Sequence, residues 1–251
     1  ETELHHLLFG VQQTPNNAQL LQLAGAVELQ LGAVAQAEVY LSKATQLAPQ
    51  LAPARRLLIA TYLRSGQSAK ALTALNAATG KDGIEPALYS LAGEVYLQNG
   101  DAKKAEEYFA KALKLDPDNA RKRTAVAITH LASGQTAGAL GDLQEIAASD
   151  TGVTADLALI SAHVRRKELD KALAAIDKLE AKQPDKPMAA NLRGRIQLAQ
   201  KDNAAARKSF ERALAIDPNF FAAAASLAAL DVAEKKPEDA KKRFETLLAT
   251  N

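Results

Sequence analysis

The sequence predicts an all-α fold, a right-handed alpha-alpha superhelix of about seven helical hairpins. Small residues and prolines recur about every 34 residues, and the apolar residues between them follow a helical period. Aromatic residues make up only 4% of the 251 residues. A core built from Ala, Leu, Ile and Val suits close packing of helices better than sheets, which favour β-branched and aromatic side chains.

Alanine marks the repeat most clearly. One alanine recurs at intervals of 33 or 34 residues, at Ala37, Ala71, Ala105, Ala139, Ala172, Ala206 and Ala240. A bulky apolar residue follows each alanine four positions later, at Leu41, Leu75, Phe109, Leu143, Ile176, Phe210 and Phe244. Because helices approach closely only where side chains are small, the alanine fixes the same crossing in every hairpin.

The repeat predicts seven units: 18–51, 52–85, 86–119, 120–152, 153–186, 187–220 and 221–251. Each unit reads as two amphipathic helices joined by a short turn. In the third unit we expect the first helix from Pro86 to Gln98 and the second helix to about Leu115. Between them, Gly100 can take positive φ and Asp101 can cap the second helix.

Residues 1–17 are expected to form the second helix of a truncated preceding repeat, because Pro15 is in register with Pro49. The chain begins at Glu1 without Met, and it ends at a predicted helix end with no polar capping helix. From these features we expect a segment cut from a longer array.

The composition argues against several classes of function. A net charge of +2 gives no general attraction to nucleic acid or to an anionic membrane. The chain has no Cys, which excludes disulfides, thiol catalysis and Cys-ligated zinc. No nucleophile elbow, glycine-rich phosphate loop or H-E-x-x-H motif occurs, so we expect no enzymatic activity, cofactor or metal.

Several repeat positions carry the residue types of a known family. Gly25, Tyr62, Ala105, Phe109 and Pro117 stand where the tetratricopeptide consensus has these residues, although its Trp is absent. The chain resembles this family over essentially its whole length. The resemblance implies a solenoid that binds proteins or peptides in a concave groove.

Three segments, 173–187, 222–231 and 236–245, carry a narrower resemblance. They are similar to the tetratricopeptide lipoproteins of bacterial PEP-CTERM/exosortase systems. This resemblance implies a protein of the bacterial envelope on the periplasmic side, held at the membrane only by a lipid anchor that this sequence lacks. Its partners would belong to envelope assembly, exopolysaccharide export and protein sorting.

The family resemblance also implies which side chains face the groove, because fixed positions of each first helix line it. The residues that we expect to contact a protein are Gln22, Arg56, Arg64, Glu94, Gln98, Arg121, Arg165, Asn191 and Arg195. The arginines could form a basic stripe that grips carboxylates bidentately, or they could be solvated residues on exposed helix faces. No three consecutive units supply the Lys/Asn/Asn/Lys/Arg clamp of chaperone-binding members, so we expect no binding of chaperone tails.

His130 and His163 occupy the same repeat position in adjacent units, where Tyr62 and Tyr96 stand earlier. A two-histidine metal or pH site could form there. The simpler interpretation is that each histidine replaces a tyrosine, half buried and hydrogen-bonded locally. Since no carboxylate or third ligand joins the histidines at a usable spacing, we predict no metal site.

Two functions remain open. The first is a non-catalytic scaffold that binds one or more protein segments. The second is a rigid structural spacer without a groove ligand, and it is favoured by the alanines that the last unit presents inward, Ala222, Ala225 and Ala229.

Overall fold

The structure is a computed structural model that describes residues 10–11, 13–80 and 83–250. Every regular element in these residues is a helix, and the remaining pairing is an isolated bridge between Gly80 and Gly83. The chain divides into two compact parts, Glu1–Thr136 and Ala137–Asn251, which we call the first and second parts. No helix in the described ranges is long and apolar enough to span a membrane.

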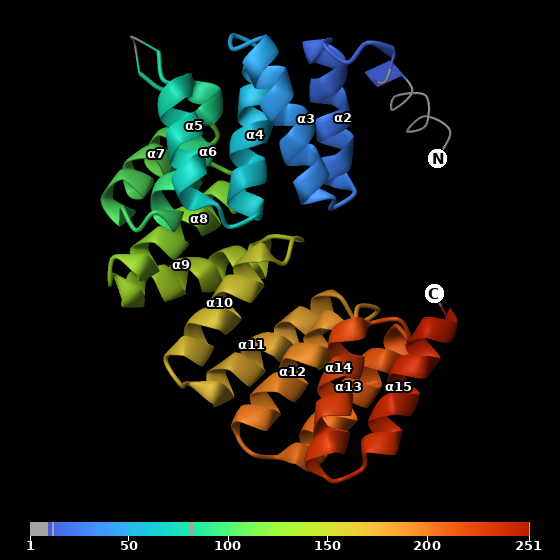
Figure 1. The fold of residues 1–251 in the computed structure, drawn as a ribbon. Helices are drawn as coiled ribbons and strands as arrows, with labels where there is room; N and C mark the ends of the chain where they lie inside the picture. The colour runs from blue at the N-terminus through green and yellow to red at the C-terminus, as the bar shows by residue number, and fades with distance from the viewer. Residues whose placement is uncertain (1–9, 12, 81–82, 251) are drawn as a thin grey trace. The chain divides into compact units, whose positions relative to one another are not determined.

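The first part is built from antiparallel helices laid side by side (Figure 1). Its helices are α2 (Ala18–Gln30), α3 (Val34–Leu47), α4 (Ala52–Arg64), α5 (Ser68–Ala78), the 3₁₀ turn η1 (Pro86–Leu88), α6 (Tyr89–Gln98), α7 (Ala102–Leu115) and α8 (Ala120–Ala132). Each helix packs against the next, and the even-numbered helices α2, α4, α6 and α8 also contact their even-numbered neighbours. We call the even-numbered helices the first helices, because each opens a predicted unit.

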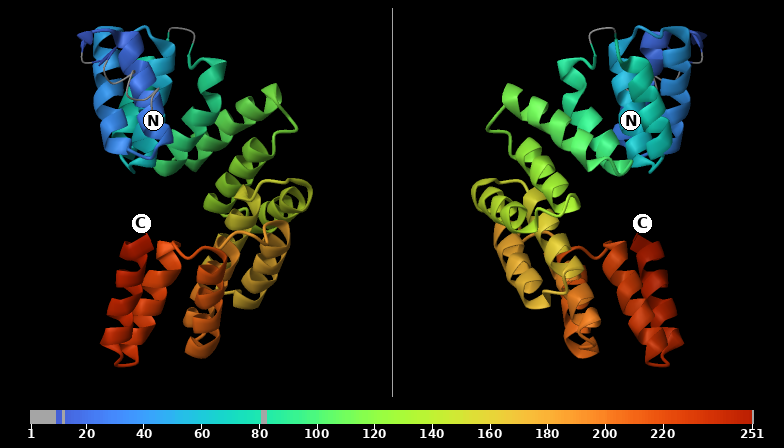
Figure 2. Two further views of the ribbon diagram at one scale, coloured as in Figure 1. Left: turned by 90° about the vertical axis from the view of Figure 1, so that its right-hand side faces the viewer. Right: turned by 90° about the vertical axis from the view of Figure 1, so that its left-hand side faces the viewer.

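The helices of the second part are α9 (Thr136–Ser149), α10 (Thr154–Arg165), α11 (Leu169–Lys182), α12 (Met188–Ala199), α13 (Asn203–Ile216), α14 (Phe221–Ala233) and α15 (Pro237–Thr250). Each helix from α10 to α14 packs against the next one along the chain. The orange-to-red helices α12–α15 stand side by side in both views of Figure 2. The first helices of this part are α10, α12 and α14.

The recurring alanines lie at the centre of the packing. All seven are at most 6% exposed, and so are the bulky residues four positions later, with one exception. Phe244 is 37% exposed, whereas its counterpart Phe210 is fully buried. The reason is that α14 covers Phe210, whereas Phe244 lies on α15 and its ring contacts Phe221, itself an exposed residue.

Glycine lets the two helices of a pair approach each other. A Cβ atom on Gly93 or Gly194 would lie 2.6 Å from the ring of Phe109 or Phe210, respectively. A Cβ atom on Gly25 would lie 2.5 Å from Leu41. These distances are shorter than any ordinary carbon contact, so the glycines are required where the large residue of the second helix lies across the first helix.

The turns between paired helices need a left-handed residue. In the first part glycine supplies it, as at Gly100, and Asp101 then caps α7 by accepting a hydrogen bond from the Lys104 amide at 3.0 Å. In the second part lysine takes this position, at Lys167, Lys201 and Lys235 with φ between 60° and 65°. These three are the non-glycine residues with positive φ in the described chain.

Two predicted helix boundaries are not confirmed by the structure. The helix expected from Pro86 begins with the 3₁₀ turn η1, and the α-helix starts only at Tyr89. Residues 1–9 lie outside the described residues, so the predicted helix over 1–17 is not tested, although Val11 is buried against Leu21 and Ala24. The division into seven units stays a prediction.

Candidate protein-binding groove

The predicted residues of the first part are spread over its four first helices. Arg56 on α4, Gln98 on α6 and Arg121 on α8 are exposed, and Gln22 on α2 is half-buried. Arg56 and Arg121 form no ion pair within the described residues. The guanidinium of Arg56 is therefore available to an external carboxylate, whereas the charge of Arg121 acts on Glu94.

Glu94 on α6 is the acidic member of this set. Its side chain is exposed, yet desolvation by the surrounding protein raises its pKa, while the nearby charge of Arg121 lowers it. Glu94 on α6 and Arg121 on the neighbouring helix α8 therefore lie close enough to interact electrostatically.

Arg64 has a structural partner that the sequence did not indicate. Its guanidinium donates a hydrogen bond of 2.8 Å to the carbonyl of Leu29 in the last turn of α2. The same carbonyl also accepts from the Gly32 amide at 3.3 Å, so Arg64 adds a second hydrogen bond at the end of α2. Arg64 therefore joins α4 to α2, and a ligand would have to compete with that contact.

In the second part, two predicted arginines line one hollow. Arg165 on α10 and Arg195 on α12 border a hollow of about 310 Å³ between these helices. Its other lining residues are Ile160, Ser161, Val164, Leu169, Leu192, Ile196 and Ala199. The hollow is mostly apolar, its polar groups are two guanidinium groups and one hydroxyl, and no acidic side chain lines it.

Helix periodicity explains this combination. On α10 the apolar pair Ile160 and Val164 is spaced by four residues, and Leu192 and Ile196 on α12 have the same spacing, so each pair lies on one helix face. Ile160 is 3% exposed and forms part of the floor, whereas Val164 is 40% exposed and remains open to a ligand.

Neither Arg165 nor Arg195 forms an ion pair within the residues that the structure describes. The adjacent Arg166, in contrast, donates to Glu168 at 2.9 Å. This hydrogen bond and a second one from His163 lower the pKa of Glu168 to about 2, so Glu168 stays ionised at physiological pH. The acid of this turn is thus engaged by other groups, and Arg165 is left without a counterion.

Asn191 is a correction to the prediction. It was expected in the groove, but it is only 5% exposed, and its Oδ1 atom is buried without a hydrogen-bond partner. The cause is its place on α12 between two residues of the helix contact, Ala190 in the core and Gly194 against Phe210. Asn191 therefore does not present its amide to the groove.

The histidines each have an acidic neighbour that the sequence analysis did not find. His130 Nε2 lies 3.4 Å from Glu106, and His163 Nδ1 lies 2.8 Å from Glu168. Both side chains are half-buried, as the simpler interpretation proposed. Within the described ranges, no group of at least three His, Cys, Asp or Glu residues could hold a metal ion.

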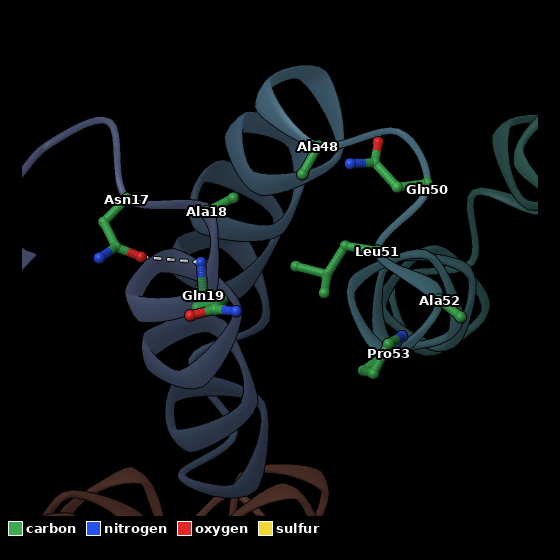
Figure 3. A pocket seen from close by; sticks show the side chains of 8 residues that line it. All are labelled: Asn17, Ala18, Gln19, Ala48, Gln50, Leu51, Ala52 and Pro53. Atoms are coloured by element: carbon green, nitrogen blue, oxygen red, sulfur yellow. Dashed lines mark hydrogen bonds between the residues drawn. The ribbon is translucent and has the colours of Figure 1, made fainter.

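A second hollow, of about 520 Å³, lies in the first part where α2 and α4 begin (Figure 3). Asn17 stands at its edge and caps α2 by accepting from the Gln19 amide at 3.0 Å. Leu51 at the start of α4 makes no such bond, and Pro53 has no amide hydrogen to offer. Because no charged side chain lines this hollow, it has no evident selectivity for a ligand.

Sequence reasoning identified both arginines of the α10–α12 hollow but not its apolar lining. Val164 and Leu192 were not among the predicted groove residues. The available signal was their place beside the predicted arginines, since Val164 directly precedes Arg165 and Leu192 precedes Arg195 by three positions.

These features define a helical-repeat protein. Its helices form antiparallel pairs, and a buried alanine lies where the two helices of a pair cross. Two profiles of the tetratricopeptide repeat family match the chain. One matches residues 58–120, 125–187 and 157–219, and the other matches 96–152 and 197–251. The chain belongs to the tetratricopeptide repeat family, and the predicted alpha-alpha superhelix is confirmed.

Solved structures show the same fold. A tetratricopeptide repeat protein from Parabacteroides merdae aligns over 98% of this chain and 91% of its own, with 18% identity and a TM-score of 0.69. Yeast Tom70 aligns over 96% of this chain and 53% of its own, with 15% identity and a TM-score of 0.70. The Cut9-Hcn1 hetero-tetramer of APC/C aligns over 88% of this chain and 44% of its own, with 19% identity and a TM-score of 0.62.

Identities this low establish the fold alone. The chain spans only about half of the Tom70 and Cut9-Hcn1 chains that it matches. No curated protein matches the sequence.

Proposed function

We propose that this protein is a non-catalytic scaffold that holds segments of other proteins against its first helices. The observation that carries the proposal is the hollow between α10 and α12, where Arg165 and Arg195 stand unpaired beside an apolar lining. Tetratricopeptide repeat proteins are generally protein-interaction scaffolds. An apolar hollow with a few placed polar groups is the usual form of a binding site.

The partners that we propose belong to bacterial envelope assembly, in connection with exopolysaccharide export and PEP-CTERM protein sorting. The support is the resemblance of segments 173–187, 222–231 and 236–245 to the lipoproteins of those systems. The proposed location is the periplasmic side of the envelope, with a lipid anchor outside this sequence.

Affinity capture from native envelope extract tests the scaffold. Wild-type protein is compared with two double variants, Arg56→Gln/Arg121→Gln in the first part and Arg165→Gln/Arg195→Gln in the second. We expect a discrete set of partners with the wild type and reduced recovery with at least one double variant. Identical recovery with all three proteins would exclude binding through the first-helix arginines, and absence of any specific partner would contradict the scaffold itself.

A rigid structural spacer is the second candidate, and α14 favours it. The three alanines that were expected on the groove side of the last unit lie on α14, where Ala222 and Ala229 are exposed and Ala225 is half-buried. Such a surface offers neither charge nor an anchor for a ligand. A spacer predicts that substitutions at Ala222 and Ala229 to Glu, which keep the helix, leave every captured partner unchanged.

A further inference from the structure

We infer that the hollow between α10 and α12 selects a peptide segment in which a bulky aliphatic side chain lies within two residues of a carboxylate. This inference rests on the proposed function and specifies the chemistry of the ligand. The aliphatic side chain would contact Val164, Leu192 and Ile196, and the carboxylate would pair with Arg165 and Arg195.

The size of the hollow limits the ligand. A volume of about 310 Å³ is at the lower end of the range for binding pockets. It admits one large side chain together with a short polar group. The groups that determine binding are therefore expected to lie within a short segment.

The charges in and around the hollow select an anion. Both guanidinium groups lack a counterion, and no acidic residue lines the hollow. Glu168 follows Val164 and Arg165 in the chain, but it is held by Arg166, by His163 and at 3.6 Å by Lys171. A ligand carboxylate would thus supply the missing negative charge, and a guanidinium can donate two parallel hydrogen bonds to its oxygens.

The apolar lining favours a carboxylate over a phosphate. Six of the nine lining residues are aliphatic, so a bound anion loses part of its hydration. A doubly charged phosphate has more hydration to lose than a singly charged carboxylate. The Ser161 hydroxyl, on the exposed side of α10, is available to donate one hydrogen bond to the bound group.

Fluorescence anisotropy with short labelled peptides tests the assignment. All probes share one Gly/Ser background. Five of them differ at two adjacent positions, which are Leu-Glu, Leu-Gln, Ser-Glu, Leu-Lys or Leu-phosphoserine. A further probe ends in Leu with a free carboxylate. We expect the Leu-Glu probe to bind at least about tenfold more tightly than Leu-Gln and Ser-Glu, and Leu-Lys not to bind. The Leu-terminated probe distinguishes a C-terminal carboxylate from a side-chain carboxylate, and either preference fits the inference.

Variants locate the binding. Arg165→Gln/Arg195→Gln should remove the preference for Leu-Glu over Leu-Gln, and the matched double variant Arg56→Gln/Arg121→Gln, with the same change in net charge, should keep it. Val164→Asp should abolish Leu-Glu binding and favour the Leu-Lys probe, because it places a carboxylate beside the arginines. Val164 is 40% exposed, so a thermal unfolding curve close to that of the wild type is expected and serves as the folding control.

Several results would overturn the inference. Among them are equal binding of Leu-Glu and Leu-Gln, tighter binding of the phosphoserine probe than of Leu-Glu, and equal loss of the preference in both double variants. If wild-type protein captures partners from extract while the peptides show no preference, the scaffold stands and the proposed ligand chemistry falls. If nothing is captured, the proposed function itself fails.

Discussion

The close approach of paired helices depends on single residues that have no side chain. At Gly93 and Gly194 the space for a Cβ atom is already filled by the buried ring of Phe109 or Phe210. Interiors packed at this density cannot absorb an added methyl group without moving a helix. Gly138 and Gly141 in α9 are different, because nothing lies within 4 Å of a Cβ atom added there.

Gly194→Ala should therefore destabilise the protein by at least about 1 kcal/mol, since the cost of overpacking exceeds the gain in helix propensity. Gly141→Ala, the same substitution in open space, should stabilise by up to about 1 kcal/mol. Thermal or urea unfolding measures both. Two variants that change stability in the same direction would contradict the packing described for Gly194.

The lysines in the turns of the second part are strained. A left-handed conformation costs a non-glycine residue about 1 kcal/mol, and the first part avoids this cost by using glycine. Lys201→Gly should therefore stabilise by about 0.5–1 kcal/mol. Lys178→Gly, at an exposed position inside α11, should destabilise by about 1 kcal/mol. Denaturant unfolding that shows a loss of stability for Lys201→Gly would refute the strain.

At the scale of helices, a buried ionic cluster joins the last three helices. Asp231 on α14 is 1% exposed and pairs with Arg207 of α13 at 2.7 Å and with Arg243 of α15. Burial raises the pKa of Asp231, but the hydrogen bonds from Arg243 and Arg207 outweigh it, so the pKa lies below its ordinary value. The cluster fixes how α13 and α15 lie against α14.

Asp231→Ala should cost about 3 kcal/mol, because it leaves the partly buried Arg243 without its acidic partner and Arg207 with Glu234 alone. Asp185→Ala, at an exposed site, should stay within about 0.5 kcal/mol of the wild type. Since the folded-state pKa of Asp231 is depressed, its contribution is complete above about pH 4 and is lost as the pH falls through the folded-state pKa. Urea unfolding from pH 7 to pH 2 should show the difference between wild type and Asp231→Ala shrink below pH 4; a constant difference would contradict the cluster.

The helices could be predicted from the sequence because their signals are local. Gly100 and the Asp101 cap act within a few residues, and α7 begins and ends where they indicated. The bond from Arg64 to Leu29 joins residues 35 positions apart in the chain, and the burial of Asn191 depends on how α12 packs. Such features depend on how the helices pack, so local signals in the sequence could not indicate them.

At the scale of the whole chain, contacts between helices are mostly between neighbours along the sequence. The stability of such an array is approximately a sum of terms from each hairpin and its interfaces, so unfolding need not be fully cooperative. A local substitution should therefore act locally.

Hydrogen exchange tests this expectation. Gly93→Ala should reduce amide protection in α6, α7 and their immediate neighbours, while α13–α15 keep the protection of the wild type. The exchange is followed by mass spectrometry on peptides from both parts, with Gly138→Ala as the control. Uniform loss of protection along the chain would show a single cooperative unit and contradict the additive account.

The most direct test of the central claim is a photo-crosslinking measurement in native extract. A diazirine-bearing aliphatic residue replaces Val164 at the hollow or, as a control, Lys178 on the exposed face of α11. We predict that the residue at position 164 crosslinks to a protein partner and that the residue at position 178 does not. The crosslinked segment of the partner should carry a carboxylate within two residues of an aliphatic side chain. No adduct at 164, or the same adducts at both positions, would contradict it.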